Sequence, residues 1–203
     1  MYADVSAAPL AEPSPTSDAP KGKLVIVAAP SGAGKTTIVR RLLERMPELA
    51  FSVSATTRPQ RAYETDGQDY YFLNLDQFLE RRQRGEFLET EEVYPGCWYG
   101  TLRIEVERQW RHSKQVIFDV DVQGARNLKA AYPENSLALF IQPPSLEALE
   151  KRLRSRATES DQSLKVRVAK AGEELKQAAH FDAVVVNDDL DTAVAEAERL
   201  VRT

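Results

Sequence analysis

A short apolar run followed by a loop with glycine and lysine constrains the fold of this chain more than any other feature. Residues 24–28 are all apolar, and the next nine read Ala29-Pro-Ser-Gly-Ala-Gly-Lys-Thr-Thr37. Such a sequence is typical of a buried parallel strand, a phosphate-binding loop and a helix that begins near the lysine. Only Ala29 departs from the loop pattern, because it stands where a glycine is usual. We therefore expect an α/β fold whose parallel sheet carries this loop.

The residue types of the loop suit the phosphates of a nucleotide. Gly32 and Gly34 allow turns at which successive backbone N–H groups point toward phosphate oxygens. Lys35 supplies a positive charge to the β- and γ-phosphates, and the Thr36 hydroxyl can ligate Mg²⁺. A plain glycine-rich turn is the weaker alternative, because Gly-Lys-Thr at a helix start is rarely accidental. We expect ATP or GTP to bind through Ala29, Pro30, Ser31, Gly32, Ala33, Gly34, Lys35, Thr36 and Thr37.

Apolar runs and amphipathic stretches alternate along the rest of the chain. Further strands are expected near 115–120, 137–141 and 183–186, and helices near 35–46, 101–112, 124–131, 145–156, 162–179 and 190–202. This alternation predicts a parallel sheet with helices on both faces. Residues 51–100, which are rich in short runs of Tyr, Thr and Phe, break the rhythm and predict a small antiparallel insertion beside the main sheet.

The first residues and the composition exclude several classes of protein. Residues 1–20 hold four prolines and no Lys or Arg, so we expect residues 1–22 to be a disordered tail and not a secretory or transit signal. A net charge of −4 argues against nucleic-acid binding by bulk charge. One cysteine and two histidines argue against a disulfide framework and a zinc site, and no apolar run suits a membrane span. A cytoplasmic protein, a monomer or a weak homo-oligomer, is the default expectation.

Two arginines suggest a second anion site. Arg58 and Arg61 lie just past an expected strand. A single guanidinium group can donate two parallel hydrogen bonds to the oxygens of a phosphate. Tyr70 and Tyr99 can add phenolic donors. Glu89 lies in a mostly apolar segment, where a carboxylate needs a partner, and guanine, unlike adenine, presents donors at N1 and N2 side by side. Alternatively, the arginines are solvated surface charges and Glu89 is an ordinary edge residue. For each residue taken alone, this alternative stays open.

Taken together, these segments resemble the guanylate kinases, nucleoside-monophosphate kinases that phosphorylate GMP. The resemblance covers residues 23–203, and its specificity comes from the joint order and spacing of segments that are weak singly. The matching segments are 29–37, 52–58 with Arg61, 67–72, 87–89, 98–101, 118–124, 143–145, 152–156 and 186–189. The resemblance implies a P-loop NTPase-type parallel sheet core with helices on both faces, a small mixed GMP-binding insertion and a helical lid. Its implied bounds are 23–54, 102–150 and 169–203 for the core, 55–101 for the insertion and 151–168 for the lid.

The resemblance also implies a role for each matching site residue. The GMP phosphate clamp falls on Arg58, Arg61, Tyr70 and Tyr99, and the guanine-reading groups fall on Ser54, Glu89 and Thr101, beside Gly100. Asp119 and Asp121 match an acidic pair near the acceptor and the Mg²⁺ water shell. Arg152, Arg156 and Arg167 match the lid arginines, and Asn187 matches a position near adenine. Lys35, Arg58 and the lid arginines would then be the catalytic set.

The implied reaction is transfer of the γ-phosphoryl group of MgATP to GMP or dGMP, in nucleotide recycling and GTP supply. The chain departs from the family pattern at Pro59, where the proline has moved, at Tyr63, where a glycine usually precedes Glu64, and at Ala157 in the lid. Two other classes remain as alternatives. A non-catalytic protein-binding module of the same fold is disfavoured because Lys35 and the lid arginines are all present. A kinase for another phosphorylated acceptor, such as a sugar phosphate, is disfavoured by the three guanine-reading residues.

Overall fold

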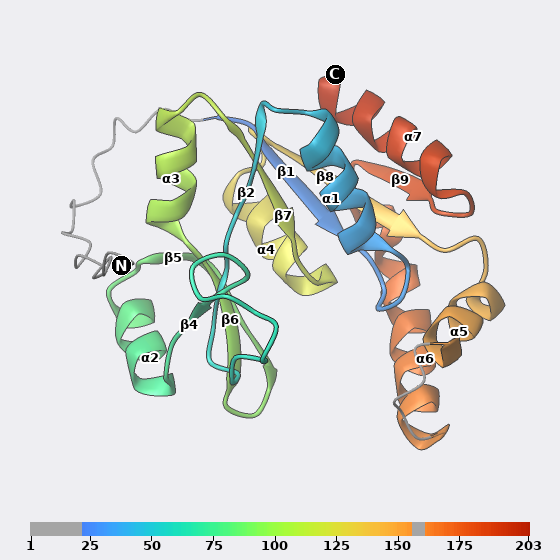
Figure 1. Cartoon of the computed structure of the whole chain (residues 1–203), viewed down its shortest axis with the longest axis horizontal. Coiled ribbons are helices and arrows are strands. Elements are labelled where there is room, and N and C mark those ends of the chain that lie inside the picture. Colours follow the sequence, from blue (N-terminus) through green and yellow to red (C-terminus); the bar gives the residue numbers. More distant parts are fainter. Residues whose placement is uncertain (1–21, 156–160) are drawn as a thin grey trace, which may run out of the picture.

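The computed structural model describes residues 22–155 and 161–203 (Figure 1). The expected tail, apart from its last residue, and lid residue Arg156 lie outside the described residues. The strands are β1 (Leu24–Ala28), β2 (Leu49–Phe51), β3 (Ala55–Thr56), β4 (Tyr71–Phe72), β5 (Phe87–Tyr94), β6 (Cys97–Leu102), β7 (Gln115–Asp119), β8 (Ser136–Gln142) and β9 (Ala183–Val186). The α-helices are α1 (Lys35–Arg45), α2 (Leu75–Gln83), α3 (Arg103–Arg111), α4 (Val122–Ala131), α5 (Leu146–Ser155), α6 (Asp161–Leu175) and α7 (Leu190–Arg202).

The main sheet is parallel and runs in the order β2-β7-β1-β8-β9. Its central strand β1 has all five residues buried, because strands lie on both edges and helices on both faces. In β1, Val27 stands beside Asp119, the last residue of β7. The carboxyl ends of β1 and β7 therefore meet where the phosphate-binding loop begins. The expected parallel α/β fold is confirmed.

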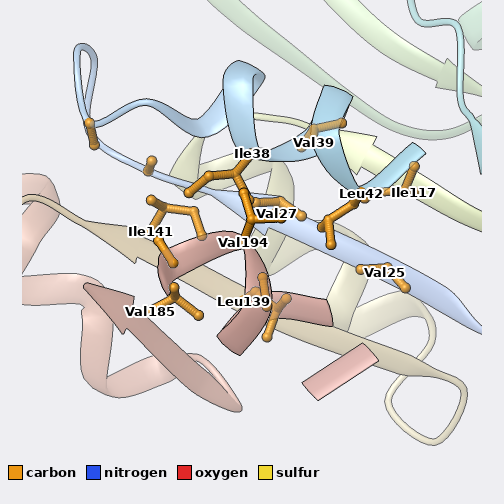
Figure 2. Close-up of a cluster of buried hydrophobic side chains, with 14 of the residues drawn as sticks. Val25, Val27, Ile38, Val39, Leu42, Ile117, Leu139, Ile141, Val185 and Val194 are labelled. Atoms are coloured by element: carbon orange, nitrogen blue, oxygen red, sulfur yellow. The ribbon is translucent and has the colours of Figure 1, made fainter. Parts of the chain in front are cut away.

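Side chains of the main sheet alternate between two buried layers. Val25 and Val27 of β1 pack toward α1 and α7, together with Leu139 of β8 (Figure 2). The intervening Leu24 and Ile26 pack on the opposite face, in a cluster to which α3 and α4 contribute. This period of two places helices on both sides of the sheet, and it fixes the strand register, since a shift by one residue would exchange the two faces.

A second sheet of order β4-β3-β6-β5 lies beside the main one (Figure 1). β3–β6 and β5–β6 are antiparallel, but β3 and β4 are parallel. The insertion is therefore mixed, as the family resemblance implies, and the antiparallel arrangement expected from its short runs of Tyr, Thr and Phe is wrong for the β3–β4 pair. The long segment between β3 and β4 returns the chain to the start of β3, so that β4 runs parallel to it. Tyr71 N–H then donates to the Ser54 carbonyl at 2.9 Å. The turn before β6 passes through Gly96, whose φ is 76°, and the chain's single cysteine, Cys97, opens the strand.

The helix α2, which the sequence patterns do not predict, covers part of the second sheet. Phe78 is its buried residue, and its ring stacks on Phe87 with centroids 4.5 Å apart. A single buried position gives no helical period, so apolar spacing does not reveal this helix. Its start is encoded, however, because Asn74 and Gln77 form a capping box.

Two further boundaries differ from expectation. Thr101 and Leu102 belong to β6, so the helix expected from residue 101 begins at Arg103. The helix expected over 162–179 ends at Leu175 and continues as a 3-10 helix, Lys176–His180. Within residues 22–155 and 161–203, we find no helix with the length and apolar character needed to cross a membrane.

Candidate active site

The phosphate-binding loop has the conformation that its glycines predict. Gly32 and Gly34 have φ values of 92° and 95°, in the left-handed region that favours glycine. A Cβ on Gly34 would lie 2.3 Å from Asn187 Nδ2, so a side chain there has no room. α1 begins at the next residue, and no side chain caps it. The N-terminal N–H groups of α1 thus face the loop, as an anion site requires.

Lys35 and Thr36 both contact the carboxylate of Asp119. Lys35 Nζ forms an ion pair with Asp119 and donates to the Val120 carbonyl at 2.5 Å. Thr36 Oγ1 donates to Asp119 Oδ2 at 2.7 Å. The hydroxyl and the carboxylate are hard oxygen donors of the kind that Mg²⁺ prefers. Among the described residues, no group of three or more His, Cys, Asp or Glu side chains is arranged to hold a metal ion.

Three side chains from the end of β9, α5 and α6 brace the loop. Asn187 is buried, and its Nδ2 donates to the Ala33 carbonyl at 2.7 Å. Arg152 Nη2 donates to the Asn187 carbonyl at 2.9 Å, and Arg167 Nη2 donates to Ser31 Oγ at 2.7 Å. Of the three expected lid arginines, Arg167 contacts the loop directly, Arg152 contacts Asn187, and Arg156 lies outside the described residues. For Asn187, the observed contact is with the loop backbone.

A cleft of about 270 Å³ lies beside the loop and brings together residues from both sheets. Eight of the expected site residues line it: Lys35, Ser54, Tyr70, Glu89, Tyr99, Gly100, Asp119 and Asp121. Glu91, Val93, Val120 and Gly124 complete the lining, and sequence reasoning assigned them no role. The loop lysine and the expected base-reading carboxylate therefore face one shared space.

Glu89 is the most perturbed carboxyl group of this cleft. Its Oε1 accepts a hydrogen bond from Thr101 Oγ1 at 2.8 Å, across the β5–β6 pair. Burial raises the pKa of Glu89 to about 7, the negative charge of Asp121 adds to this rise, and the hydrogen bond from Thr101 opposes it. A buried carboxylate is stabilised by further N–H donors. Glu89 therefore suits a ligand that presents such donors.

Arg58 lies in a polar and aromatic enclosure and is not a solvated surface charge. Its guanidinium binds Glu64 through two hydrogen bonds, of 2.5 and 2.7 Å, and lies 4.8 Å from the Tyr70 ring centroid. The side chain is 13% exposed. The hydrogen bonds from Arg58 hold the pKa of Glu64 at about 2. The same contacts, with a smaller contribution from Tyr99, raise the pKa of Arg58. Arg58 thus contacts Tyr70, which lines the cleft, but does not itself belong to the lining.

Arg61 does not reach the cleft lining in this structure. Its side chain is 59% exposed, and Nη1 donates to the hydroxyl of Tyr63 at 3.0 Å. Tyr63 is the residue that replaces the glycine usual before Glu64, and it is 76% exposed. Glu64 holds this loop together, because its carboxylate accepts both from Arg58 and from the Arg61 backbone N–H at 2.9 Å. Glu64 had no expected role, although an acid close to two arginines is a signal for such a pair.

The two tyrosines of the cleft pack edge to face, with ring centroids of Tyr70 and Tyr99 5.9 Å apart. Burial raises the pKa of Tyr70 above its ordinary value, so its hydroxyl stays protonated and can donate. The adjacent Gly100 has no room for a side chain, because a Cβ there would lie 2.8 Å from the Phe87 ring. Tyr70, Tyr99 and Gly100 all line the cleft, so these contacts fix part of its wall.

Comparisons with known proteins agree on one family. The family model described as guanylate kinase matches residues 21–203. The guanylate kinase of Salinibacter ruber is 50% identical over 183 residues, which are 90% of this chain and 97% of that protein. The guanylate kinase of Porphyromonas gingivalis is 48% identical over 180 residues, 88% and 96% of the two chains. The crystal structure of guanylate kinase from Anaplasma phagocytophilum has a TM-score of 0.72 at 30% identity, covering 90% of this chain and 86% of its own. This chain therefore belongs to the guanylate kinase family of nucleoside-monophosphate kinases, the ATP:GMP phosphotransferases.

Proposed function

We propose that this chain transfers the γ-phosphoryl group of MgATP to GMP and to dGMP, and so contributes to nucleotide recycling and GTP supply. One observation carries the proposal: Lys35 of the phosphate-binding loop and Glu89 of the second sheet line the same cleft. A donor and an acceptor that meet in one cleft suit direct transfer, because binding replaces a bimolecular encounter in water.

The acceptor binds with its base against Glu89 and its phosphate toward Arg58. The N1 and N2 donors of guanine satisfy the buried carboxylate, next to Thr101 and Ser54. Adenine would leave this carboxylate without its donors, which costs on the order of several kcal/mol. dGMP carries the same base and is expected to react as well. Tyr70 and Tyr99 add hydroxyl donors near the phosphate, and Arg61 joins them if it leaves Tyr63.

The donor nucleotide binds with its phosphates on the loop of residues 29–37. The Lys35 ammonium group then leaves its ion pair with Asp119 and binds the phosphate oxygens instead. The Thr36 hydroxyl and the Asp119 carboxylate suit Mg²⁺, since Thr36 Oγ1 and Asp119 Oδ2 lie 2.7 Å apart in a set of oxygen donors. When bound there, the ion neutralises phosphate charge. Asn187 holds the loop in place through the hydrogen bond from its side-chain amide to the Ala33 carbonyl.

In the chemical step, a phosphate oxygen of GMP attacks the γ-phosphorus of ATP in line with the leaving oxygen. The bond from this oxygen to phosphorus forms as the bond from the γ-phosphorus to the β–γ bridging oxygen breaks, and ADP leaves. No general base is needed, because a nucleoside monophosphate is largely ionised near neutral pH. The positive charges of Lys35, Arg58, Arg152, Arg156 and Arg167 stabilise the charge that spreads over the transferred group.

The test is an ADP-release assay with GMP, dGMP, AMP, UMP and CMP as acceptors. We expect turnover with GMP and dGMP, and kcat/KM at least about 100-fold lower with the other three. Comparable activity with AMP would contradict the role of Glu89. A lack of ADP release with all five nucleotides would instead favour a kinase for another acceptor or a non-catalytic protein-binding module.

A further inference from the structure

Gly124 is a helical glycine whose presence neither capping nor helix stability explains. It lies in the first turn of α4 and lines the cleft. Glycine is the least favourable ordinary residue inside a helix, apart from proline, because it loses the most backbone entropy. By helix propensity alone, alanine would be favoured at this position, which points to another role for the glycine.

The N-terminal cap of α4 does not require a glycine. In α2, α4 and α7, the cap side chain accepts a hydrogen bond from the backbone N–H three residues on, at Gln77, Gly124 and Thr192. The distances are similar, 2.8, 2.7 and 2.9 Å. Two of these donors carry full side chains, so the same hydrogen bond forms equally well with a Cβ present.

The place of Gly124 in the cleft distinguishes it from those two residues. A Cβ added to Gly124 would lie 3.5 Å from Glu89 Oε2 and 3.2 Å from Asp121 Oδ1. Glu89 Oε1 accepts from Thr101, whereas Oε2 is the oxygen on the Gly124 side. A methyl group there would fill the space through which a ligand donor reaches Oε2.

We propose that Gly124 is a specificity-determining residue for the acceptor base: because it has no side chain, the base can approach Glu89 Oε2. The inference rests on the proposed function, and it adds a steric element to recognition by the carboxylate. It has an unusual consequence, since alanine at this position improves helix propensity while it obstructs the acceptor. Stability and acceptor binding are therefore expected to change in opposite directions.

The test compares Gly124→Ala with Gly172→Ala. Gly172 is a matched control, because it also lies in a helix, α6, and a Cβ there would meet nothing within 4 Å. For Gly124→Ala we expect KM for GMP to rise by about tenfold or more, KM for ATP to stay within about twofold, and the thermal midpoint to stay level or rise. For Gly172→Ala we expect both KM values to be unchanged.

A second measurement locates the obstruction at the base. Guanosine carries the base but no phosphate, so Gly124→Ala should weaken its competitive inhibition by about the same factor as it weakens GMP. If guanosine inhibited both proteins equally while GMP lost affinity, the obstruction would lie at the phosphate and the inference would be wrong.

Other outcomes also separate the two proposals. A wild-type KM for GMP in Gly124→Ala, an equal rise for ATP, or a lowered thermal midpoint would each overturn the role of Gly124 and leave the proposed reaction intact. A wild-type enzyme that releases no ADP with GMP would overturn the proposed reaction itself.

Discussion

In the proposed reaction, the choice of acceptor depends on the protonation of one residue, Glu89. Its carboxyl group is buried beside Asp121, and these two features together raise its pKa to about 7. The unfolded chain releases this proton near the ordinary value of 4.5, whereas the folded protein keeps it up to about pH 7. Between these values the folded state binds more protons, so its stability falls as the pH rises.

Glu89→Gln removes this titration and gives the first prediction. A pKa shift of this size corresponds to roughly 3 kcal/mol of stability. From pH 4.5 to about 7, the stability of the wild type should therefore fall relative to that of Glu89→Gln. Urea unfolding of both proteins at a series of pH values measures it. Curves that stay parallel across this range would show that Glu89 does not titrate as described.

Lys35→Ala gives a second prediction at this scale. Loss of a charge that contacts the transferred group should lower kcat by on the order of 100-fold or more. Lys176 is a suitable control, because its side chain is 68% exposed and pairs only with Glu173 among the contacts described for it. Steady-state kinetics of Lys35→Ala and Lys176→Ala test this, and near-normal turnover in Lys35→Ala would refute the mechanism.

Single residues also show how far sequence reasoning reaches. The conformations of Gly32 and Gly34 were predictable, because only glycine adopts such φ values without strain. The pairing of Arg58 with Glu64 was not, since it depends on how the loop between β3 and β4 folds back. The outward-facing Arg61 donates to the hydroxyl of Tyr63, a residue unusual at that position, and lies 3.8 Å from Glu64 Oε1. Side-chain pairs that form only through tertiary structure cannot be predicted from the spacing of residues in the sequence.

At the scale of elements, the end of β9 supports the phosphate-binding loop. Asn187 is buried under the loop, and its side-chain amide is the donor to the Ala33 carbonyl. Arg167, from α6, donates a hydrogen bond to Ser31 of the same loop. The loop is therefore held by elements that lie more than a hundred residues away in the chain.

Asn187→Ala tests this support. The variant leaves a buried carbonyl without its donor, which costs about 1–3 kcal/mol. KM for ATP should rise by several-fold, roughly the factor that 1 kcal/mol gives, while KM for GMP changes little. Asp188→Ala is the control, because the adjacent Asp188 is exposed. If KM for GMP rose as much as KM for ATP, Asn187 would support the whole cleft and not the loop alone.

Four of the five strands of the main sheet were predictable because each centres on an apolar run, whereas β2, which has three residues, was not predicted. The strand predicted at 183–186 matches β9, and the phosphate-binding loop directly follows β1, as the sequence indicates. The second sheet was less predictable, because β3 and β4 have two residues each and carry no periodic signal. The missed helix α2 has one buried side chain, so only its capping box marks it.

At the scale of the molecule, the two sheets meet at one cleft, and the reaction requires that water be kept out of it. We expect the second sheet and α6 to approach the main sheet when both nucleotides bind, because an open cleft would allow hydrolysis of ATP. Small-angle scattering with a bisubstrate analogue should show a smaller radius of gyration than without ligand. GMP alone and ATP alone serve as partial-occupancy controls. An unchanged radius with the analogue bound would contradict closure.

The turn that opens β6 gives this motion a natural reporter. Cys97 is the single thiol of the chain and is half-buried at the end of the β5–β6 hairpin. A maleimide dye would therefore attach at one known point on the second sheet, with no cysteines to remove first. Its emission, followed during turnover, would time each opening and closing of the enzyme directly.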